Sequence, residues 1–243
     1  MSRTLQQTID FARPFINYLP LTVGANNEPA ITNANNILQT FLSVDVGPWS
    51  WNRSSITFST VVGTQDYPVS ILSASVPSFG WLETASLKPA SGTIFQIKDV
   101  KNTEPLAESS DQARPNAIAV QKDDGAGNIT FRFMGNMDAI YTCTINFQMA
   151  AQPFTTTSST WSPIPDRYAY IYNRGFLAEC LQPVDAQRSQ QEKQRFILSL
   201  ISIAEGMKLQ NKAIFMAQYL NIDMQTAAEM LGVQQGGQAK GAR

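Results

Sequence analysis

The spacing of hydrophobic residues changes twice along the chain and divides it into three blocks. In residues 1–48 apolar side chains recur every three or four positions, as on one face of a helix. Over residues 52–150 they alternate with polar side chains, which is typical of strands buried on one face. From residue 163 onward the helical spacing returns. The pattern predicts helices, then a β-region, then helices again.

The first block predicts two helices. Thr4 and Gln7 have the spacing of a capping box, in which each residue satisfies a free N–H of the other at the start of a helix. Asn26 or Asn27 is expected to cap the second helix. Gly47, followed by proline, is expected to stop it.

The middle block predicts an antiparallel sheet or sandwich. The alternation is clearest in four segments: 56–59, 118–121, 129–134 and 141–149. Glycine-containing turns separate the strands near residues 63, 92, 125 and 135. Residues 102–116 are polar with two prolines, and we expect them to form a long exposed loop.

The last block predicts three helices whose ends are marked by aspartate, proline or glycine: 166–182, 185–207 and 223–232. Gly175 interrupts the first of these at a cost of about 1 kcal/mol relative to alanine. We therefore expect it to permit close approach of a neighbouring helix. Residues 233–243 contain no core residue after Val233 and are expected to be a flexible tail.

These elements predict an α+β fold. Helices from both ends of the chain form one bundle, because the N-terminal helices are too short to be stable alone. An antiparallel β-sheet or sandwich is inserted into that bundle. The expected parts are the N-terminal helices of the bundle in 1–48, the inserted β-domain in 49–160, the C-terminal helices of the bundle in 161–232, and the tail in 233–243.

Composition removes several classes of chemistry. The 243 residues include no histidine and two cysteines, and 15 % are charged, with a net charge of −1. Without histidine there is no Ser-His-Asp triad, no Cys-His dyad and no zinc site of the usual Cys/His type. The near-neutral charge argues against a strongly basic nucleic-acid binder. We expect no enzyme activity, no cofactor and no metal.

The sequence also suggests where the protein is made. No segment approaches the 18 or so apolar residues of a membrane span, and no apolar core of a signal peptide is visible near the N-terminus. Synthesis in the cytoplasm is expected. Cys143 and Cys180 lie in apolar surroundings and are interpreted as buried free thiols, although a disulfide remains open.

Two groups of acidic residues are candidate sites. Residues 123–128 (DDGAGN) resemble a calcium loop but lack the ligand spacing of an EF-hand, so a β-turn is the preferred interpretation. The β-region also carries Glu83, Asp99, Glu104 and Glu108. A glycosidase needs two carboxylates a few ångströms apart, and nothing in the spacing indicates such a pair.

Basic and aromatic residues give a further alternative. Arg188, Lys193 and Arg195 follow each other on the long helix, and residues 49–53 (WSWNR) place tryptophans next to an arginine. Either group could contact nucleic acid through phosphate pairing and stacking. A solvated helix face and an aromatic anchor are the favoured interpretations.

The polar face of the predicted sheet is more informative. It contains uncharged short side chains, namely Thr57, Ser59, Thr60, Thr142, Thr144, Asn146 and Gln148. Such a surface, like the tail, suits contact with another chain. The expected contact residues in the tail are Gln234, Gln235, Gln238, Lys240 and Arg243.

Several strings resemble the head-to-tail connector (adaptor, or head-completion) proteins of tailed bacteriophages. Residues 4–10 (TLQQTID) and 30–38 (AITNANNIL) are similar to their paired N-terminal helices. Residues 55–68 (SITFSTVVGTQDYP) resemble the strand and Gly-x-x-x-Tyr-Pro turn of phage neck chains, and 161–168 (WSPIPDRY) the entry to their C-terminal helices.

The resemblance implies a ring, dodecameric in this family, docked beneath the portal protein at the capsid vertex. The bundle would form the subunit contacts, the C-terminal segment would reach the portal, and the β-domain would face outward or toward tail or neck proteins. Double-stranded DNA would pass through the lumen without sequence-specific binding, and the protein would reside in the virion. The alternatives are a tail-hub or neck protein that attaches tail fibres, and a carbohydrate-binding or carbohydrate-active β-domain.

Overall fold

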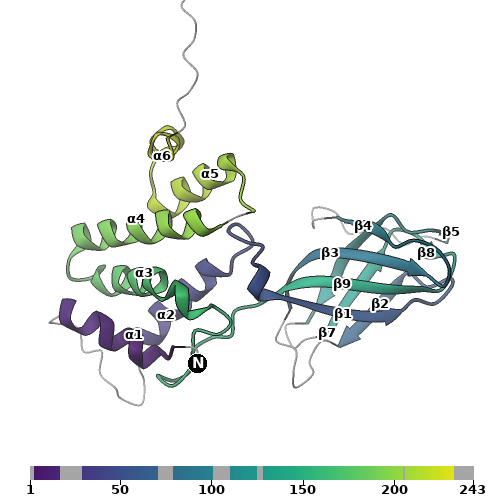
Figure 1. Cartoon of the computed structure of the whole chain (residues 1–243), viewed down its shortest axis with the longest axis horizontal. Coiled ribbons are helices and arrows are strands. Elements are labelled where there is room, and N and C mark those ends of the chain that lie inside the picture. Colours follow the sequence, from purple (N-terminus) through teal and green to yellow (C-terminus); the bar gives the residue numbers. More distant parts are fainter. Residues whose placement is uncertain are drawn as a thin grey trace, which may run out of the picture. The chain divides into compact units, whose positions relative to one another are not determined.

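A computed structural model describes residues 3–16, 29–70, 79–100, 110–124, 128–204 and 206–232. The chain forms two compact units. One unit combines Met1–Gly47 with Pro153–Arg243 and contains the helices, and the other, Pro48–Gln152, contains the strands (Figure 1). The fold is therefore α+β.

The helical unit is built around α3. Its helices are α1 (Leu5–Ala12), α2 (Ala30–Phe41), α3 (Ala169–Leu181), α4 (Ala186–Ile203), α5 (Leu209–Leu220) and α6 (Met224–Met230), with 3₁₀ turns at Arg13–Phe15 and Asp166–Tyr168. Helix α3 is buried on nearly all sides because α1, α2 and α4 pack against it. Helices from both ends of the sequence thus share one core.

Gly175 allows this close packing. A Cβ atom at this position would lie 2.9 Å from Cδ1 of Ile37 on α2 and 3.0 Å from Cδ2 of Phe196 on α4. The sequence prediction of a close helix approach at Gly175 is confirmed.

Side-chain caps fix several helix starts. Thr4 and Gln7 form the predicted capping box at α1. Asp185 accepts a hydrogen bond from the backbone N–H of Arg188 at the start of α4 (2.9 Å), and Asp223 accepts one from Thr226 at the start of α6 (2.9 Å). These caps satisfy N–H groups that have no partner within the helix.

Two helix boundaries differ from the sequence prediction. Helix α2 follows Pro29 and already ends at Phe41, so Gly47 does not stop it; Asn26 and Asn27 lie outside the described residues. The long helix predicted for 185–207 is wrong at its C-terminal end. Ala204 leaves the helical conformation (ψ 83°) ahead of Gly206, and a separate helix, α5, starts at Leu209.

Residues 153–160, which the pattern assigns to the β-domain, belong with the helices. The backbone N–H of Phe154 donates to Oδ1 of Asn35 on α2 (2.7 Å), and Leu5 donates to the carbonyl of Ser159 (2.9 Å). Just beyond, the Trp161 indole donates to Thr8 on α1 (2.8 Å) and stacks on Tyr172 of α3. The β-domain boundary predicted at residue 160 is therefore wrong, because these long-range contacts place the segment in the helical unit.

The strand unit contains one seven-stranded sheet in the order β1-β9-β3-β4-β6-β7-β2. The strands are β1 (Arg53–Ser59), β2 (Asp66–Ser70), β3 (Phe79–Pro89), β4 (Phe95–Asp99), β6 (Ala117–Asp123), β7 (Asn128–Phe133) and β9 (Tyr141–Met149). A 3₁₀ turn, Ser50–Asn52, precedes β1. A small second sheet pairs β5 (Gln112–Ala113) with β8 (Asn136–Met137).

The sheet is mixed, which corrects the antiparallel prediction. Strands β4 and β6 run parallel, as do β5 and β8. A parallel pair needs a crossover of a dozen or so residues, and the long segment after β4 provides it. Part of that segment is β5, which the sequence prediction treated as loop.

The sheet curls around its own core (Figure 1). Strands β1 and β2 end the strand order but are joined by a short turn, in which the Tyr67 hydroxyl bonds to the backbone of Val61 (2.9 Å). The predicted alternation is confirmed in β7 and β9, whose inward side chains Ile129, Phe131, Phe133, Cys143, Ile145 and Phe147 are fully buried.

Candidate interaction surfaces

The outer face of β1, β9 and β3 is a regular array of short polar side chains. Its three cross-strand rows are Ser55–Asn146–Thr84, Thr57–Thr144–Ser86 and Ser59–Thr142–Lys88. The hydroxyls of Thr57 and Thr144 are 3.3 Å apart, and Asn146 donates to Thr84 Oγ1 (2.9 Å). Lys88 is the only charged member. We call these nine residues the polar face.

The alternation in the sequence predicts part of the polar face. The three polar-face residues on β3 were not predicted, although Thr84, Ser86 and Lys88 alternate with the buried Ala85 and Leu87. Two predicted members are instead buried. Thr60 bonds to the backbone N–H of Tyr141 (2.8 Å), and Gln148 is fully covered.

Gln148 belongs to a partly buried hydrogen-bond network centred on Glu83. A bulge in β3 leaves Glu83 as an extra residue between Leu82 and Thr84, and bulges re-aim side chains in this way. The Glu83 carboxylate accepts two hydrogen bonds from the Arg53 guanidinium and one from Gln148 Nε2 (2.8 Å). Oε1 of Gln148 accepts from the Trp49 backbone N–H (3.0 Å).

The environment keeps Glu83 ionised. Burial raises the pKa of this carboxyl, but the hydrogen bonds from Arg53 and Gln148 outweigh burial and lower the pKa overall. The same interaction raises the pKa of Arg53. The hydrogen-bonded ion pair therefore connects β1 to β3 across β9.

Tryptophans lie close to this network in the fold. Trp49 is buried, and its ring stacks on half-buried Trp51 with 5.3 Å between ring centroids. Trp81, opposite Gln148 in the β3–β9 register, is also half-buried. Residues 49–53 therefore contact the strand unit itself, and Arg53 is engaged by Glu83.

Large apolar side chains are exposed in the turns at one end of the sheet. Five of them are between 45 % and 63 % exposed: Val61, Val62, Ile94, Met134 and Ile140. The pairings Ser59–Thr142 and Pro89–Tyr141 show that the turns after β1 and β3 and the start of β9 share this end. This group was not predicted from the sequence, where its signal is an apolar residue within two positions of Gly63, Gly92 and Gly135.

The predicted basic residues of α4 have separate contacts. The Arg188 guanidinium lies 5.5 Å from the ring centroid of Phe15. Arg195 donates to Glu192 on the same helix (2.8 Å), and Arg174 on α3 donates to the other oxygen of that carboxylate (2.8 Å). Lys193 is half-buried.

The acidic candidates are only partly described by the structure. Asp124 accepts from the backbone N–H and side-chain amide of Asn128 (3.0 and 2.7 Å), as expected of a turn residue. Asp99 ends β4, while Glu104 and Glu108 lie outside the described residues. In the part of the chain that the structure describes, no three metal-binding side chains form a group.

Both cysteines are free and buried, as predicted. Burial raises the pKa of the Cys143 thiol to about 12 and that of Cys180 to about 11. Their thiolates are therefore suppressed at neutral pH.

The predicted tail contacts Gln234, Gln235, Gln238, Lys240 and Arg243 lie outside the described residues. Within the described ranges, none of the helices is both long and apolar enough to cross a membrane. A scan against protein-family models and a search of curated proteins found no match to this chain.

Proposed function

We propose that this protein is a structural subunit of a tailed-bacteriophage virion that forms a homo-oligomeric ring between the portal protein and the tail. In this proposal helices from both chain ends form the ring-building bundle, and the β-domain is an insertion that faces outward or toward tail or neck proteins. The ring, with twelve subunits by family resemblance, extends the channel for double-stranded DNA and helps to retain the packaged genome.

The observation that carries the proposal is the order of the two units. The strand unit is one continuous segment, whereas the helical unit needs both ends of the chain. This matches the order helices, β-domain, helices that the connector resemblance implies.

The exposed surfaces also support an assembly role. The polar face has a single charge among nine residues, and uncharged groups cost less to desolvate against a partner than ions do. Exposed apolar side chains in the turns are typical of surfaces that another protein covers. These features suit a subunit with extensive protein contacts.

Co-purification with the portal protein of the same phage, imaged by electron microscopy, tests the proposal. We expect a ring bound at one end of the portal. A protein that never assembles on the portal, even in excess, would contradict it. Binding to tail proteins alone would favour the alternative of a tail-hub or neck protein that attaches fibres.

The tail gives a second test. Removing residues 233–243 should weaken portal docking and leave the thermal unfolding temperature unchanged, because that segment has no core residue after Val233. Replacing Gln234, Gln235 and Gln238 with serine while keeping the length separates side-chain contacts from mere reach. Unfolding of the truncated protein would contradict the role given to the tail.

A carbohydrate-binding β-domain is the second candidate. The observation in its favour is the location of half-buried Trp51 and Trp81 near the carboxylate of Glu83. A glycan array on the intact protein, repeated with Glu83→Gln, tests it. Specific glycan binding that is lost with Glu83→Gln would favour this candidate over the ring.

A further inference from the structure

A pair of arginines on α3 and α4 is held in place by a nearly buried carboxylate. Arg174 and Arg195 each donate one hydrogen bond of 2.8 Å to opposite oxygens of Glu192. The Glu192 side chain is 10 % exposed, whereas those of Arg174 and Arg195 are 40 % and 60 % exposed. The carboxylate lies inside and the two cations face solvent.

This arrangement leaves capacity for an anion. A guanidinium has five N–H donors in a rigid fork, and Glu192 receives one from each arginine. Two guanidinium groups and one carboxylate sum to a local charge of +1. Glu192 already restricts the guanidinium groups of Arg174 and Arg195. These side chains therefore lose less conformational entropy when they bind a ligand.

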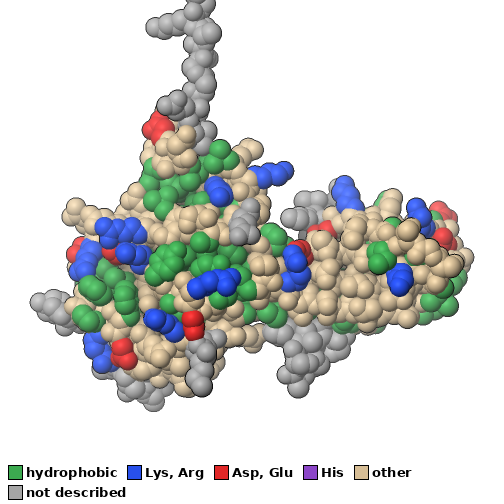
Figure 2. All heavy atoms as spheres, in the orientation of Figure 1, with side chains coloured by type: hydrophobic (Ala, Val, Ile, Leu, Met, Phe, Trp, Pro, Cys, Tyr) green, Lys and Arg blue, Asp and Glu red, His purple; other side chains and the backbone are tan. Residues whose placement is uncertain are grey.

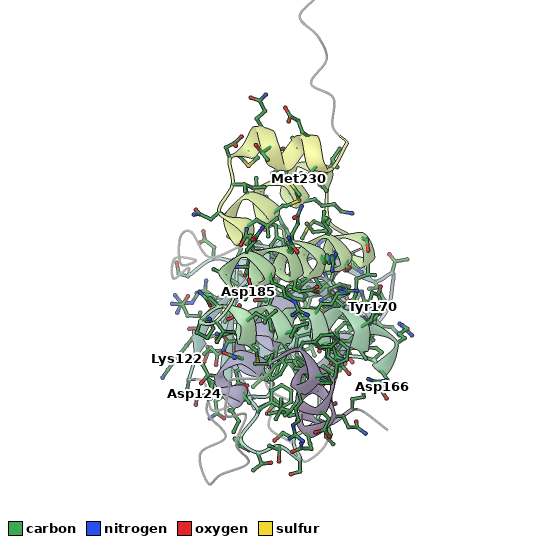
Figure 3. All side chains as sticks on the ribbon, turned by 90° about the vertical axis from the view of Figure 1, so that its left-hand side faces the viewer. Lys122, Asp124, Asp166, Tyr170, Asp185 and Met230 are labelled. Atoms are coloured by element: carbon green, nitrogen blue, oxygen red, sulfur yellow. The ribbon has the colours of Figure 1, made fainter. Side chains whose placement is uncertain are left out.

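Neighbouring residues extend the same face of α3. Tyr170 and Arg174 are four residues apart and share one side of α3, and Arg167 lies on the 3₁₀ turn that leads into this helix. Tyr170 is 53 % exposed, and Arg167 is exposed with its guanidinium over the ring of Tyr168. Figure 2 shows Lys and Arg side chains gathered over α4 and beside α3, and in Figure 3 Tyr170 lies on the same side of the helices as Asp166.

We propose that Arg174, Glu192 and Arg195, with Tyr170 beside them, form a phosphate clamp that contacts the backbone of duplex DNA. The guanidinium fork matches phosphate oxygens in a bidentate manner, and arginine and tyrosine are common donors to DNA phosphates. The clamp lies on the sides of two packed helices, which suits backbone contact without base reading.

The inference deepens the proposed function by naming the residues that meet the DNA, and it rests on that function for its biological setting. One clamp per chain is a weak site, in keeping with DNA that must slide. In a ring the same weak contact is repeated in every subunit.

Fluorescence anisotropy of the full-length protein with a labelled duplex of about 20 base pairs at low salt tests the clamp. With its local charge of +1 the clamp neutralises about one phosphate, which predicts a slope of about −1 for log K against log salt concentration. The triple variant Arg174→Gln, Glu192→Gln, Arg195→Gln removes all three charges and leaves no ion unpaired. We expect it to weaken binding about tenfold and to flatten the salt slope.

The matched control is Arg13→Gln, which removes one exposed positive charge elsewhere and changes the net charge by −1, as the triple variant does. It should keep the affinity within about twofold and leave the slope unchanged. An equal loss in the control would overturn the clamp, because binding would then follow overall charge. If the triple variant fails to fold, Arg195→Gln alone should reduce the slope by about one, since Arg174 still pairs with Glu192.

Competition identifies the ligand. Inorganic phosphate should displace the duplex only at high concentration, and polyglutamate should displace it poorly. Displacement by polyglutamate as effective, per charge, as by unlabelled DNA would overturn the assignment to nucleic acid. DNA binding needs no portal, so a failed clamp and a failed ring are separate results.

Discussion

Three positions show how a single side chain, or its absence, decides local packing. Gly175 lets α2 and α4 approach α3 because it has no Cβ. Trp161 joins the segment after the strand unit to α1 through Thr8 and to α3 through Tyr172. Glu83 connects β1 and β3 because a bulge turns it toward Arg53. Each role is set by partners that are distant in sequence.

Gly175→Ala should destabilise the helical unit. The added methyl would clash with Ile37 Cδ1 at 2.9 Å, and overpacking of this kind costs about 1–3 kcal/mol. The better helix propensity of alanine returns about 1 kcal/mol. Urea unfolding monitored by circular dichroism measures the net change.

Ile37→Val supplies the matched control because it removes the clashing Cδ1 atom. The free energy of unfolding should fall less in the double variant than the two single losses added together. Strict additivity would show that Ile37 is not what limits space at Gly175.

The two buried thiols should make the fold sensitive to alkali. Their pKa values are raised to about 12 and about 11 in the folded protein, against about 8.5 when exposed. Their contribution to stability is complete below the unfolded pKa and is lost as the pH rises toward the folded values. Between pH 8 and about 9.5, the free energy of unfolding should fall by about 1 kcal/mol per thiol.

The variant Cys143→Ala, Cys180→Ala is the control for this loss. Its stability should be lower overall but much less dependent on pH in that window, which lies below the ordinary pKa of tyrosine. A decline as steep as in the original protein would assign the pH dependence to other groups.

Among the secondary-structure elements, β3 carries the most irregularity. Its two register shifts against β9 lie between Phe79 and Trp81 and between Leu82 and Thr84. The first is possible because Gly80 has no side chain to collide with β9. The second places Glu83 in the network with Gln148. One strand therefore supplies three residues of the polar face and the carboxylate of an ion pair with Arg53.

Gly80→Ala should therefore disturb the strand unit. A Cβ atom there would lie 2.8 Å from the carbonyl oxygen of Gln148 and 3.0 Å from the backbone of Ala150, and backbone atoms cannot rotate away. We expect a loss of about 1–3 kcal/mol, measured by thermal unfolding of the β signal. Ser86→Ala on the outer face of the same strand should stay within about 0.5 kcal/mol.

At the scale of the whole molecule, the chain order makes the two units unequal. The strand unit has its own core and is one continuous segment. The core of the helical unit is complete only when the N-terminal helices pack against α3. The strand unit is therefore the part able to fold by itself.

Residues 48–152 expressed alone should fold. We expect a cooperative thermal transition and dispersed amide signals in NMR spectra, because the aromatic and aliphatic core of the unit lies within that segment. A chain truncated after residue 152 should retain this transition and lack helical signal. A molten isolated segment would show that the helical unit is required for the strand core.

The sequence alone determined the α+β class, the positions of most elements, the buried thiols, the capping box and the special role of Gly175. These follow from local spacing and side-chain size, which the chain carries in any context. Four features depend on the three-dimensional contacts: the parallel β4–β6 pair, the place of residues 153–160, the bulge at Glu83 and the Arg174–Glu192–Arg195 cluster. Each depends on which distant segments come into contact. Hydrophobic periodicity describes one segment at a time, whereas these hydrogen bonds and buried contacts form between segments.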